Sequence, residues 1–525
     1  MKRIAYLLMM LWGLHATAQD MPVIDIVYNG STAQVTIPAE ASGVVLNSTL
    51  GSPNVNIYSA TTTNEYRYRV TGTTKNGSLL IMGNYKLTLE LAGCSITNTV
   101  GAAIDVECGK RVAVVLAAGT TNTLADGAGA QKAALYFSGH PEFEGTGTLN
   151  VTGNAKHAIA AKEYMELKED MGTLNVLGAV SDGIHCGRGK ADNANNYFEM
   201  KGGLVNITGV GSDCIDSDDY GCVKLKGGVL NLDVKADGGA GIKCDSIFKM
   251  TDGQANIVLS GADAEGIRVN HTAYFKGGDI SILNAGAGSK GIKLKKETTG
   301  TVLNGGFAYF EGTDVDITLT GDNYIDDSRC MGVSVDQNMA LSSDDIQIKL
   351  ASSQAKAYNV KGGLSITESG CLAVLGNDAD VHPELYKNDM SLYFTLTQDG
   401  MPIADYANLR VTATNRDGGC CGVGDVFMRT GGYTYGYMRI YSNRTDADKD
   451  VISLLVTDAS NGEVVGLGED VVFVTNASVG KPSAPIAFSP LTIGKVARMV
   501  KSMKEGEGVY KITDVESNVR RLLQR

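Results

Sequence analysis

The chain has 525 residues, of which 65 are glycine and nine are proline, and its formal net charge is −12. This acidic balance argues against a nucleic-acid surface and fits a calcium ion or a polar, neutral ligand. Frequent glycine among valine, isoleucine, threonine and asparagine favours short strands with tight corners, and the length allows two to four domains.

Residues 1–18 have the features of a secretory signal peptide. A charged start (MKR) precedes an apolar run over 4–14, and the A-x-A motif that ends at Ala18 marks a cleavage site. The apolar run is too short to span a membrane comfortably, and no second such stretch follows it. We therefore expect a mature protein that is secreted, periplasmic or held at the cell surface. Residues 19–80 are predicted as an N-terminal β segment or cap.

A 25-residue period runs through the middle of the chain. The glycines that open the same short strand in each repeat are Gly147, Gly172, Gly203, Gly228, Gly253 and Gly278, with steps of 25, 31, 25, 25 and 25. A strand-like repeat of this length predicts an all-β solenoid with about 25 residues per coil, over residues 81–380. The one longer step places an insertion after Cys186, and such loops commonly project on the binding face.

Each coil is predicted to contain three strand segments. The first carries an outward asparagine (Asn150, Asn175, Asn206, Asn231 and Asn256), which favours a ladder of amide hydrogen bonds over sugar contact. The second centres on an inward isoleucine (Ile159, Ile184, Ile215, Ile242, Ile267 and Ile292), and the third carries apolar pairs such as Phe198 and Met200. Cys186 and Cys244 share an inward column, which predicts buried free thiols. The Cys420-Cys421 pair has no assigned role.

Carboxylates collect on neighbouring coils around the repeat isoleucine. Asp182 and Asp213 should lie about 5 Å apart, which corresponds to roughly 3 kcal/mol of repulsion that a cation must offset. Calcium is the expected ion because it takes six to eight oxygen ligands. The alternative is a solvated acidic edge paired with His185 and Lys243. The predicted metal ligands are Asp182, Asp213, Asp216, Asp218, Asp219 and Asp245.

A basic column lies beside the acidic one. Lys243, Arg268 and Lys293 each follow a repeat isoleucine directly. These cations could form salt bridges, for instance to Glu265, or bind the carboxylates of an acidic polysaccharide. A third use is catalytic, because uronate lyases combine calcium with an arginine or lysine base. The predicted carbohydrate-binding residues are Lys243, Arg268, Lys293 and His185, and the first three are the base candidates if the protein is a lyase.

The rest of the chain predicts two further units. Regularly spaced strands over 388–480 indicate a small β-sandwich. Residues 481–490 hold three prolines and are predicted as a linker, and 491–525 contain two amphipathic helices, the second with a capping box at Thr513-x-x-Glu516. This short C-terminal helical pair could bind a protein partner or cap a neighbouring unit.

Several stretches resemble a known family. They are LTLELAGCSITNTVGAAIDVECGKRVAVVLAAGTTNTLADG (87–127), AALYF (133–137), EGTGTLNVTGN (144–154) and the coils with VSDGIHC and GSDCIDS. Over roughly residues 30–310 the chain is similar to the exported carbohydrate-binding β-helix proteins. The resemblance implies a right-handed parallel β-helix of the polysaccharide-lyase type, with bound calcium, a plant-type polysaccharide ligand (acidic or cellulose) and no proven catalysis. The family's D-G-I motif corresponds to Asp182-Gly183-Ile184 and, with changes, to Asp213-Cys214-Ile215 and Glu265-Gly266-Ile267.

Three functions follow as hypotheses. The leading one is a secreted, calcium-containing β-helix that binds polysaccharide without cleaving it. The second is a calcium-dependent polysaccharide (uronate) lyase, and the third is a structural or adhesive surface stalk.

Overall fold

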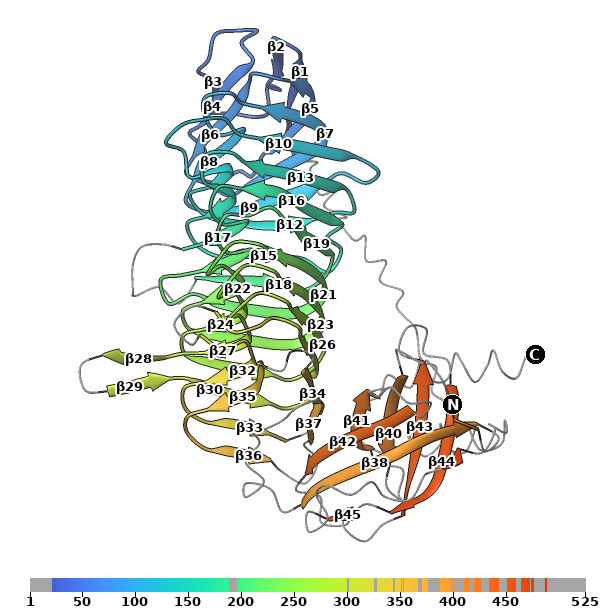
Figure 1. Ribbon diagram of the computed structural model, residues 1–525. Helices are drawn as coiled ribbons and strands as arrows, with labels where there is room; N and C mark the ends of the chain where they lie inside the picture. The colour runs from blue at the N-terminus through green and yellow to red at the C-terminus, as the bar shows by residue number, and fades with distance from the viewer. Residues whose placement is uncertain are drawn as a thin grey trace, which may run out of the picture.

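The computed structural model describes residues 21–187, 196–299, 302–324, 328–342, 345–350, 352, 354–366 and 371–375, and then the strands between 388 and 488 (Figure 1). The predicted signal peptide (1–18), most of the inserted loop (188–195) and the predicted C-terminal helices (491–525) lie outside the described residues. The part of the chain that the structure describes consists of strands, turns and loops and contains no helix. It therefore contains no helix that could cross a membrane.

The second strand segments of successive coils stack into one sheet of 13 strands. Its first pair, β3 (Val44–Leu46) and β4, is antiparallel, and the pairs that follow are parallel. In order the parallel strands are β4 (Asn54–Ser59), β6 (Ser78–Gly83), β8 (Ile104–Cys108), β11 (Ala133–Phe137), β14 (His157–Ala161), β17 (Ile184–Cys186), β20 (Ile215–Ser217), β22 (Ala240–Cys244), β24 (Glu265–Val269), β27 (Lys290–Leu294), β32 (Met331–Val335) and β35 (Lys356–Val360). This stack confirms the predicted β-solenoid.

The first and third segments of the coils belong to a second large sheet. The first segments are β10 (Thr121–Ala125), β13 (Thr148–Gly153), β16 (Thr173–Ala179), β19 (Leu204–Ile207), β26 (Asp279–Asn284), β31 (Asp314–Leu319), β34 (Asp345–Leu350) and β37 (Cys371–Leu375). The third segments are β9 (Arg111–Leu116), β12 (His140–Glu144), β15 (Met165–Leu167), β18 (Tyr197–Met200), β25 (Thr272–Phe275), β30 (Phe307–Phe310), β33 (Met339–Leu341) and β36 (Leu364–Ile366).

Some strands run through the corner between two coils. β21 (Cys222–Val234) pairs with β18 in its first half and with β19 in its second half. β23 (Ile247–Leu259) runs through the next corner and pairs with both halves of β21. The anchor glycine Gly228 lies at this corner with φ +83°, a conformation that favours glycine. A Cβ there would lie 2.5 Å from Met200 Cε and 2.7 Å from the carbonyl oxygen of Gly203. The repeated glycine is therefore required where one coil turns onto the next.

The parallel stack begins near the N-terminus. β1 (Val23–Asn29) pairs antiparallel with β2 (Thr32–Thr36) and parallel with β5 (Arg67–Thr74), and β5 pairs parallel with β7 (Leu87–Thr97). The solenoid therefore extends into the range 19–80, which the sequence assigned to an N-terminal segment or cap. Further along the stack, between β27 and β30, β28 (Lys296–Thr299) and β29 (Val302–Gly305) form an antiparallel hairpin that projects from it in Figure 1. The sequence did not predict this hairpin.

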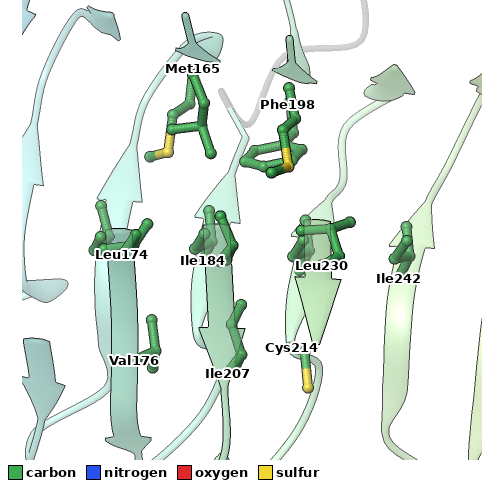
Figure 2. Packing of buried hydrophobic residues seen from close by; sticks show 14 of the residues in the cluster. Met165, Leu174, Val176, Ile184, Phe198, Ile207, Cys214, Leu230 and Ile242 are labelled. Atoms are coloured by element: carbon green, nitrogen blue, oxygen red, sulfur yellow. The ribbon is translucent and has the colours of Figure 1, made fainter. Parts of the chain in front are cut away.

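The core is one continuous apolar column inside the coils. All six repeat isoleucines have 0–1% exposure, and burial of such a side chain contributes roughly 2–3 kcal/mol. Figure 2 shows Ile184, Leu230 and Met165 among side chains from different coils that pack together. Cys186 and Cys244 are buried and free, as predicted. Solenoid coils bury their faces only against one another, so this core depends on stacking.

The outward asparagines form the predicted ladder. From Asn175 to Asn256, the Nδ2 atom of each asparagine donates a hydrogen bond to the Oδ1 atom of the asparagine on the preceding coil. The four donor–acceptor distances are 2.8–2.9 Å. The amides are thereby used within the fold, which confirms the structural interpretation of this column.

Most strand pairs after residue 388 are antiparallel. β38 (Asn388–Gln398) pairs with β42 (Thr434–Ser442), and β42 also pairs with β37 of the solenoid. A separate four-stranded sheet has the order β41 (Cys420–Asp425), β40 (Leu409–Thr414), β43 (Val451–Asp458) and β44 (Val464–Val472). The short strands β39 (Met401–Pro402), β45 (Val474–Thr475) and β46 (Ala487–Phe488) pair with β38, so β46 falls within the range predicted as a linker.

Candidate functional site

The charged columns lie on the outer surface of the 13-stranded sheet. Parallel register brings His185 opposite Asp216, Asp216 opposite Lys243, and Lys243 opposite Arg268, which is opposite Lys293. Because alternate residues of a strand point to opposite faces, the inward isoleucines place these side chains outward. We call the outer surface of β17, β20, β22, β24 and β27 the charged wall.

Three carboxylates converge at one end of the charged wall. Asp182, Asp213 and Asp216 each have an oxygen within 4.8 Å of the others, and their exposures are 5%, 6% and 4%. We call these three residues the acidic cluster. Two of the outer oxygens connect coils, because Asp182 Oδ1 accepts from the backbone N–H of Asp213 at 3.2 Å and Asp213 Oδ1 accepts from that of Ala240 at 2.7 Å. The other oxygens face the cluster.

Two cationic side chains reach into the acidic cluster. His185 Nδ1 lies 3.3 Å from both Asp182 Oδ2 and Asp216 Oδ2. Lys243 Nζ lies 3.0 Å from Asp216 Oδ1 and 3.4 Å from Asp213 Oδ2. Burial opposes their charge, but the carboxylates outweigh it: they raise the pKa of His185 to about 9 and that of Lys243 well above its ordinary value. Part of the acidic charge is thus neutralised within the fold.

The carboxyl groups differ from one another in their ionisation. Burial alone would raise the pKa of Asp182, but hydrogen bonds from His157 and His185 hold it well below its usual range. Burial raises the pKa of Asp213 to about 6, and the neighbouring charges of Asp216 and Asp182 oppose the pull of Lys243. Burial also raises the pKa of Asp218 to about 6. Asp213 and Asp218 therefore carry the least stabilised negative charge.

The donor set fits a divalent cation that prefers oxygen. Asp182, Asp213 and Asp216 supply converging carboxylates, and Asp218 Oδ1 is a buried oxygen without a hydrogen-bond partner, 3.8 Å from His185 Nε2. Since two of the carboxylate oxygens already accept backbone N–H groups, the protein offers fewer than the six to eight oxygens that calcium takes, and water or a ligand must complete the shell.

The remaining two predicted ligands lie elsewhere. Asp245 Oδ1 accepts a hydrogen bond from Asn270 Nδ2 at 2.8 Å. Asp219 has φ +55° and is followed by Tyr220 at φ +64°, in a tight turn. Within the described ranges, neither residue joins the groups of metal-ligating atoms that Asp182, Asp213, Asp216 and Asp218 form.

His157 is a site residue to which the sequence assigned no role. Its Nδ1 atom lies 3.0 Å from Asp182 Oδ2, and its ring stacks on that of His185 with centroids 4.3 Å apart and planes at 12°. Burial lowers its pKa. The available signal was its position two residues before the repeat isoleucine, where Asp182 and Asp213 stand on the next coils.

The other end of the charged wall has an excess of positive charge. Glu265 is 4% exposed and forms two ion pairs. Its Oε2 atom lies 3.4 Å from Arg268 Nε, and its Oε1 atom pairs with the ammonium group of Lys293. Lys295 lies beside them, and burial together with Lys293 and Arg268 lowers its pKa. Glu265 thus faces three cations, and Asp263 and Asp336 also interact with Lys293 and Lys295 respectively. This end of the charged wall is suited to an anionic ligand.

A second charged surface, on the third strand segments, differs in being internally paired. Glu166 accepts hydrogen bonds from Lys168, Tyr197 and Lys201 at 2.7–3.2 Å. Burial would raise its pKa, but these partners lower it to about 2. The rings of Tyr164 and Tyr197 stack at 4.7 Å with planes at 2°, so they cover each other's faces. Sugar rings stack on exposed aromatic faces, and these faces are not free.

The fold is a parallel β-solenoid with a charged outer surface on its 13-stranded sheet. Residues 53–296 match the family model described as "Carbohydrate-binding domain-containing protein", and this range includes the whole charged wall. The match confirms the predicted resemblance over these residues. A solved structure, the polysaccharide lyase-like protein from C. thermocellum in a gadolinium derivative, aligns with 16% identity and a TM-score of 0.33, covering 67% of this chain and 99% of that one. No curated protein matches this chain.

Proposed function

We propose that this protein binds an acidic polysaccharide along the charged wall and does not cleave it. The observation that carries the proposal is the excess of cations around Glu265, in register with a cluster of buried carboxylates on the same sheet. Arg268, Lys293 and Lys295 would pair with carboxylates of the glycan, because Arg in particular matches their planar geometry. The carbohydrate-binding family match supports this class of ligand.

We further propose that Ca²⁺ is the cation at the acidic cluster. Asp182, Asp213 and Asp216 would hold it, with Asp218 close by. The ion would offset the mutual repulsion of these carboxylates and offer open coordination positions to oxygens of the glycan. The protein's own residues orient the ligand: the backbone N–H groups of Asp213 and Ala240 fix the carboxylates, and the basic end defines where anionic groups lie.

The ion pairs disfavour the base candidates of the lyase hypothesis. A general base must lose its proton near the operating pH, whereas the carboxylates around Lys243 raise its pKa and Lys293 is paired with Glu265. Lys295 has the lowered pKa that a base needs, so it is the residue to test if cleavage is detected. Secretion is part of the proposal and depends on the sequence features of residues 1–18.

Affinity gels with polygalacturonate and with cellulose test this function. We expect retention on polygalacturonate in calcium, loss of most of that retention in chelator, and no unsaturated uronate products in the ultraviolet. The variant Arg268→Gln/Lys293→Gln should bind polygalacturonate at least about tenfold more weakly, because two charge-assisted contacts are lost. Lys249→Gln, an exposed lysine on the third strand segments, is the matched control. No retention on any glycan would favour the stalk, and release of unsaturated products would favour the lyase.

A further inference from the structure

We propose that Tyr220 binds one sugar ring of the polysaccharide, in the turn that follows Asp218 at the edge of the charged wall. The inference rests on the proposed function, and it adds an uncharged contact to a surface whose other proposed contacts are ionic. It is carried by the exposure of the tyrosine ring, by the strained backbone that presents it, and by the position of the turn.

The ring of Tyr220 is exposed and is not used by the fold. Tyr220 is 58% exposed, against 36% for Tyr58 and 40% for Tyr324. Among the described residues its side chain forms no hydrogen bond and joins no aromatic pair, whereas the rings of Tyr164 and Tyr197 cover each other's faces. Both faces of an exposed aromatic ring are available to a ligand.

The backbone at Tyr220 is unfavourable for a bulky side chain. Its φ of +64° follows a φ of +55° at Asp219, and the left-handed region is strained for residues other than glycine. Asp263 has a similar φ of +54°, but its carboxylate is used by the fold, in an ion pair with Lys290 at 2.5 Å. No contact of the Tyr220 ring within the described structure offsets the strain. Strained residues of this kind cluster at ligand sites, and a ligand contact would account for a ring here.

The turn that carries Tyr220 is fixed from below by a buried amide. Asn196 is 2% exposed, and its Nδ2 atom donates to the carbonyl oxygen of Asp218 at 2.7 Å and to that of Asp219 at 3.3 Å. The N–H of Gly221 closes the turn by donating to the carbonyl oxygen of Asp218 at 2.9 Å. The backbone is therefore held in one conformation before a ligand arrives, which reduces the entropy cost of binding.

The turn is also longer than its counterparts on the next coils. Four residues (218–221) connect β20 to β21, whereas two residues connect β22 to β23 (245–246) and β24 to β25 (270–271). The coil thus carries two additional residues at a corner where the stack does not require them. Loop residues on a rigid scaffold commonly provide binding contacts.

The position of the turn links it to the basic end of the charged wall. Main-chain hydrogen bonds between coils stack Asp218, Asp245, Asn270 and Lys295 in one column. Lys295 is three coils from Asp218, which corresponds to about 14 Å at the usual strand spacing. The Cα atom of Tyr220 lies at most about 7 Å from that of Asp218, two residues earlier. Tyr220 and the basic end therefore lie along the same edge, where one extended polysaccharide chain contacts both.

Tyrosine suits the C–H face of a sugar ring. The C–H groups of a pyranose are weakly positive, and they pack on the negative face of an aromatic ring. Tyrosine offers a large contact area with only two side-chain torsions to order. The carboxylates of Asp218 and Asp219 would repel a uronate carboxylate, so the bound unit should direct its own carboxylate away from this turn.

Calorimetric titration of the full-length protein with polygalacturonate, in calcium, tests the contact. Tyr220→Ala should weaken binding by about tenfold, whereas Tyr220→Phe should bind as the unaltered protein does, because it keeps the ring. Tyr220→Gly should weaken binding as Tyr220→Ala does and should raise the urea midpoint of unfolding, because glycine relieves the strain. Tyr58→Ala is the matched control: Tyr58 is 36% exposed and lies in β4, six strands before β20 in the same sheet.

Fluorescence detects the contact directly. The chain has one tryptophan, Trp12, so Tyr220→Trp in a Trp12→Phe background gives a protein with a single tryptophan, in this turn. Saturating polygalacturonate should shift its emission to shorter wavelength, because the stacked sugar excludes water. An unchanged emission in a protein that still binds polygalacturonate overturns the proposal.

The charge variant Arg268→Gln/Lys293→Gln separates the two hypotheses. If it loses binding while Tyr220→Ala and Tyr220→Gly bind normally, the proposal for Tyr220 is overturned and the proposed function stands. Equal weakening in Tyr58→Ala, or in Tyr220→Phe, also overturns the tyrosine contact alone. If the unaltered protein binds neither polygalacturonate nor cellulose, the proposed function fails, and the sugar contact fails with it.

Discussion

Replacing Lys243 by methionine tests whether the acidic cluster is neutralised from within the fold. The ammonium lies 3.0 Å from Asp216 Oδ1 and 3.4 Å from Asp213 Oδ2. At an effective dielectric of about 20, each attraction amounts to about 5 kcal/mol before desolvation is subtracted. Removing one partner of a buried ion pair costs about 3–5 kcal/mol, because the remaining charge is left uncompensated. Lys243 is 22% exposed, so we expect a loss of about 3 kcal/mol in the free energy of unfolding.

Urea denaturation in chelator and in calcium measures this loss. The destabilisation should be full in chelator and largely absent in calcium, because the ion takes over the neutralisation that Lys243 provided. Calcium binding itself should become tighter, since a positive charge beside the site is gone. Lys235→Met is the control: its pair with Asp233 is 2.7 Å long but Lys235 is 62% exposed, so the change should stay below about 1 kcal/mol.

Two results would refute this reasoning. A loss below about 1 kcal/mol in chelator would mean that Lys243 does not compensate the buried carboxylates. Equal losses in chelator and in calcium would mean that the ion does not bind at the acidic cluster.

Further predictions concern the fold around the site. Asn206→Ala removes two amide hydrogen bonds of the ladder and should lower the free energy of unfolding, measured by urea denaturation, by about 2 kcal/mol. Asn256→Ala, at the end of the asparagine ladder, should lower it by less, and equal losses would argue against the ladder. The folded-state pKa of Glu166 is lowered from 4.5 to about 2, so its stabilisation is present above pH 4.5 and lost as the pH falls to 2. Glu166→Gln should therefore flatten the acid limb of the stability profile, and Glu311→Gln, an exposed pair with Lys276, should leave it unchanged. Cys244 is fully buried, so thiol reagents should modify it only on unfolding and Cys244→Ser should cost about 1–3 kcal/mol; rapid labelling of the native protein would contradict this.

The period of the sequence was sufficient to predict the features that depend on stacking alone. Equivalent positions of successive coils must lie above one another, so the isoleucine column, the Asn ladder and the burial of Cys186 and Cys244 follow from spacing. The same rule placed Asp216, Lys243 and Arg268 in one outward row. The projecting hairpin after Lys295 has no counterpart in the period, so the sequence did not indicate it.

Only the tertiary structure decided how the charged side chains divide their contacts. Column position is defined to about the 5 Å spacing of coils, whereas an ion pair or a metal ligand depends on side-chain rotamers and on differences of less than 1 Å. The sequence grouped Asp219 and Asp245 with the metal ligands and left His157 without a role. The structure places Asp245 against Asn270 and turns His157 onto Asp182 at 3.0 Å. Rotamers across neighbouring coils, which no spacing encodes, therefore determine which of these side chains contact one another.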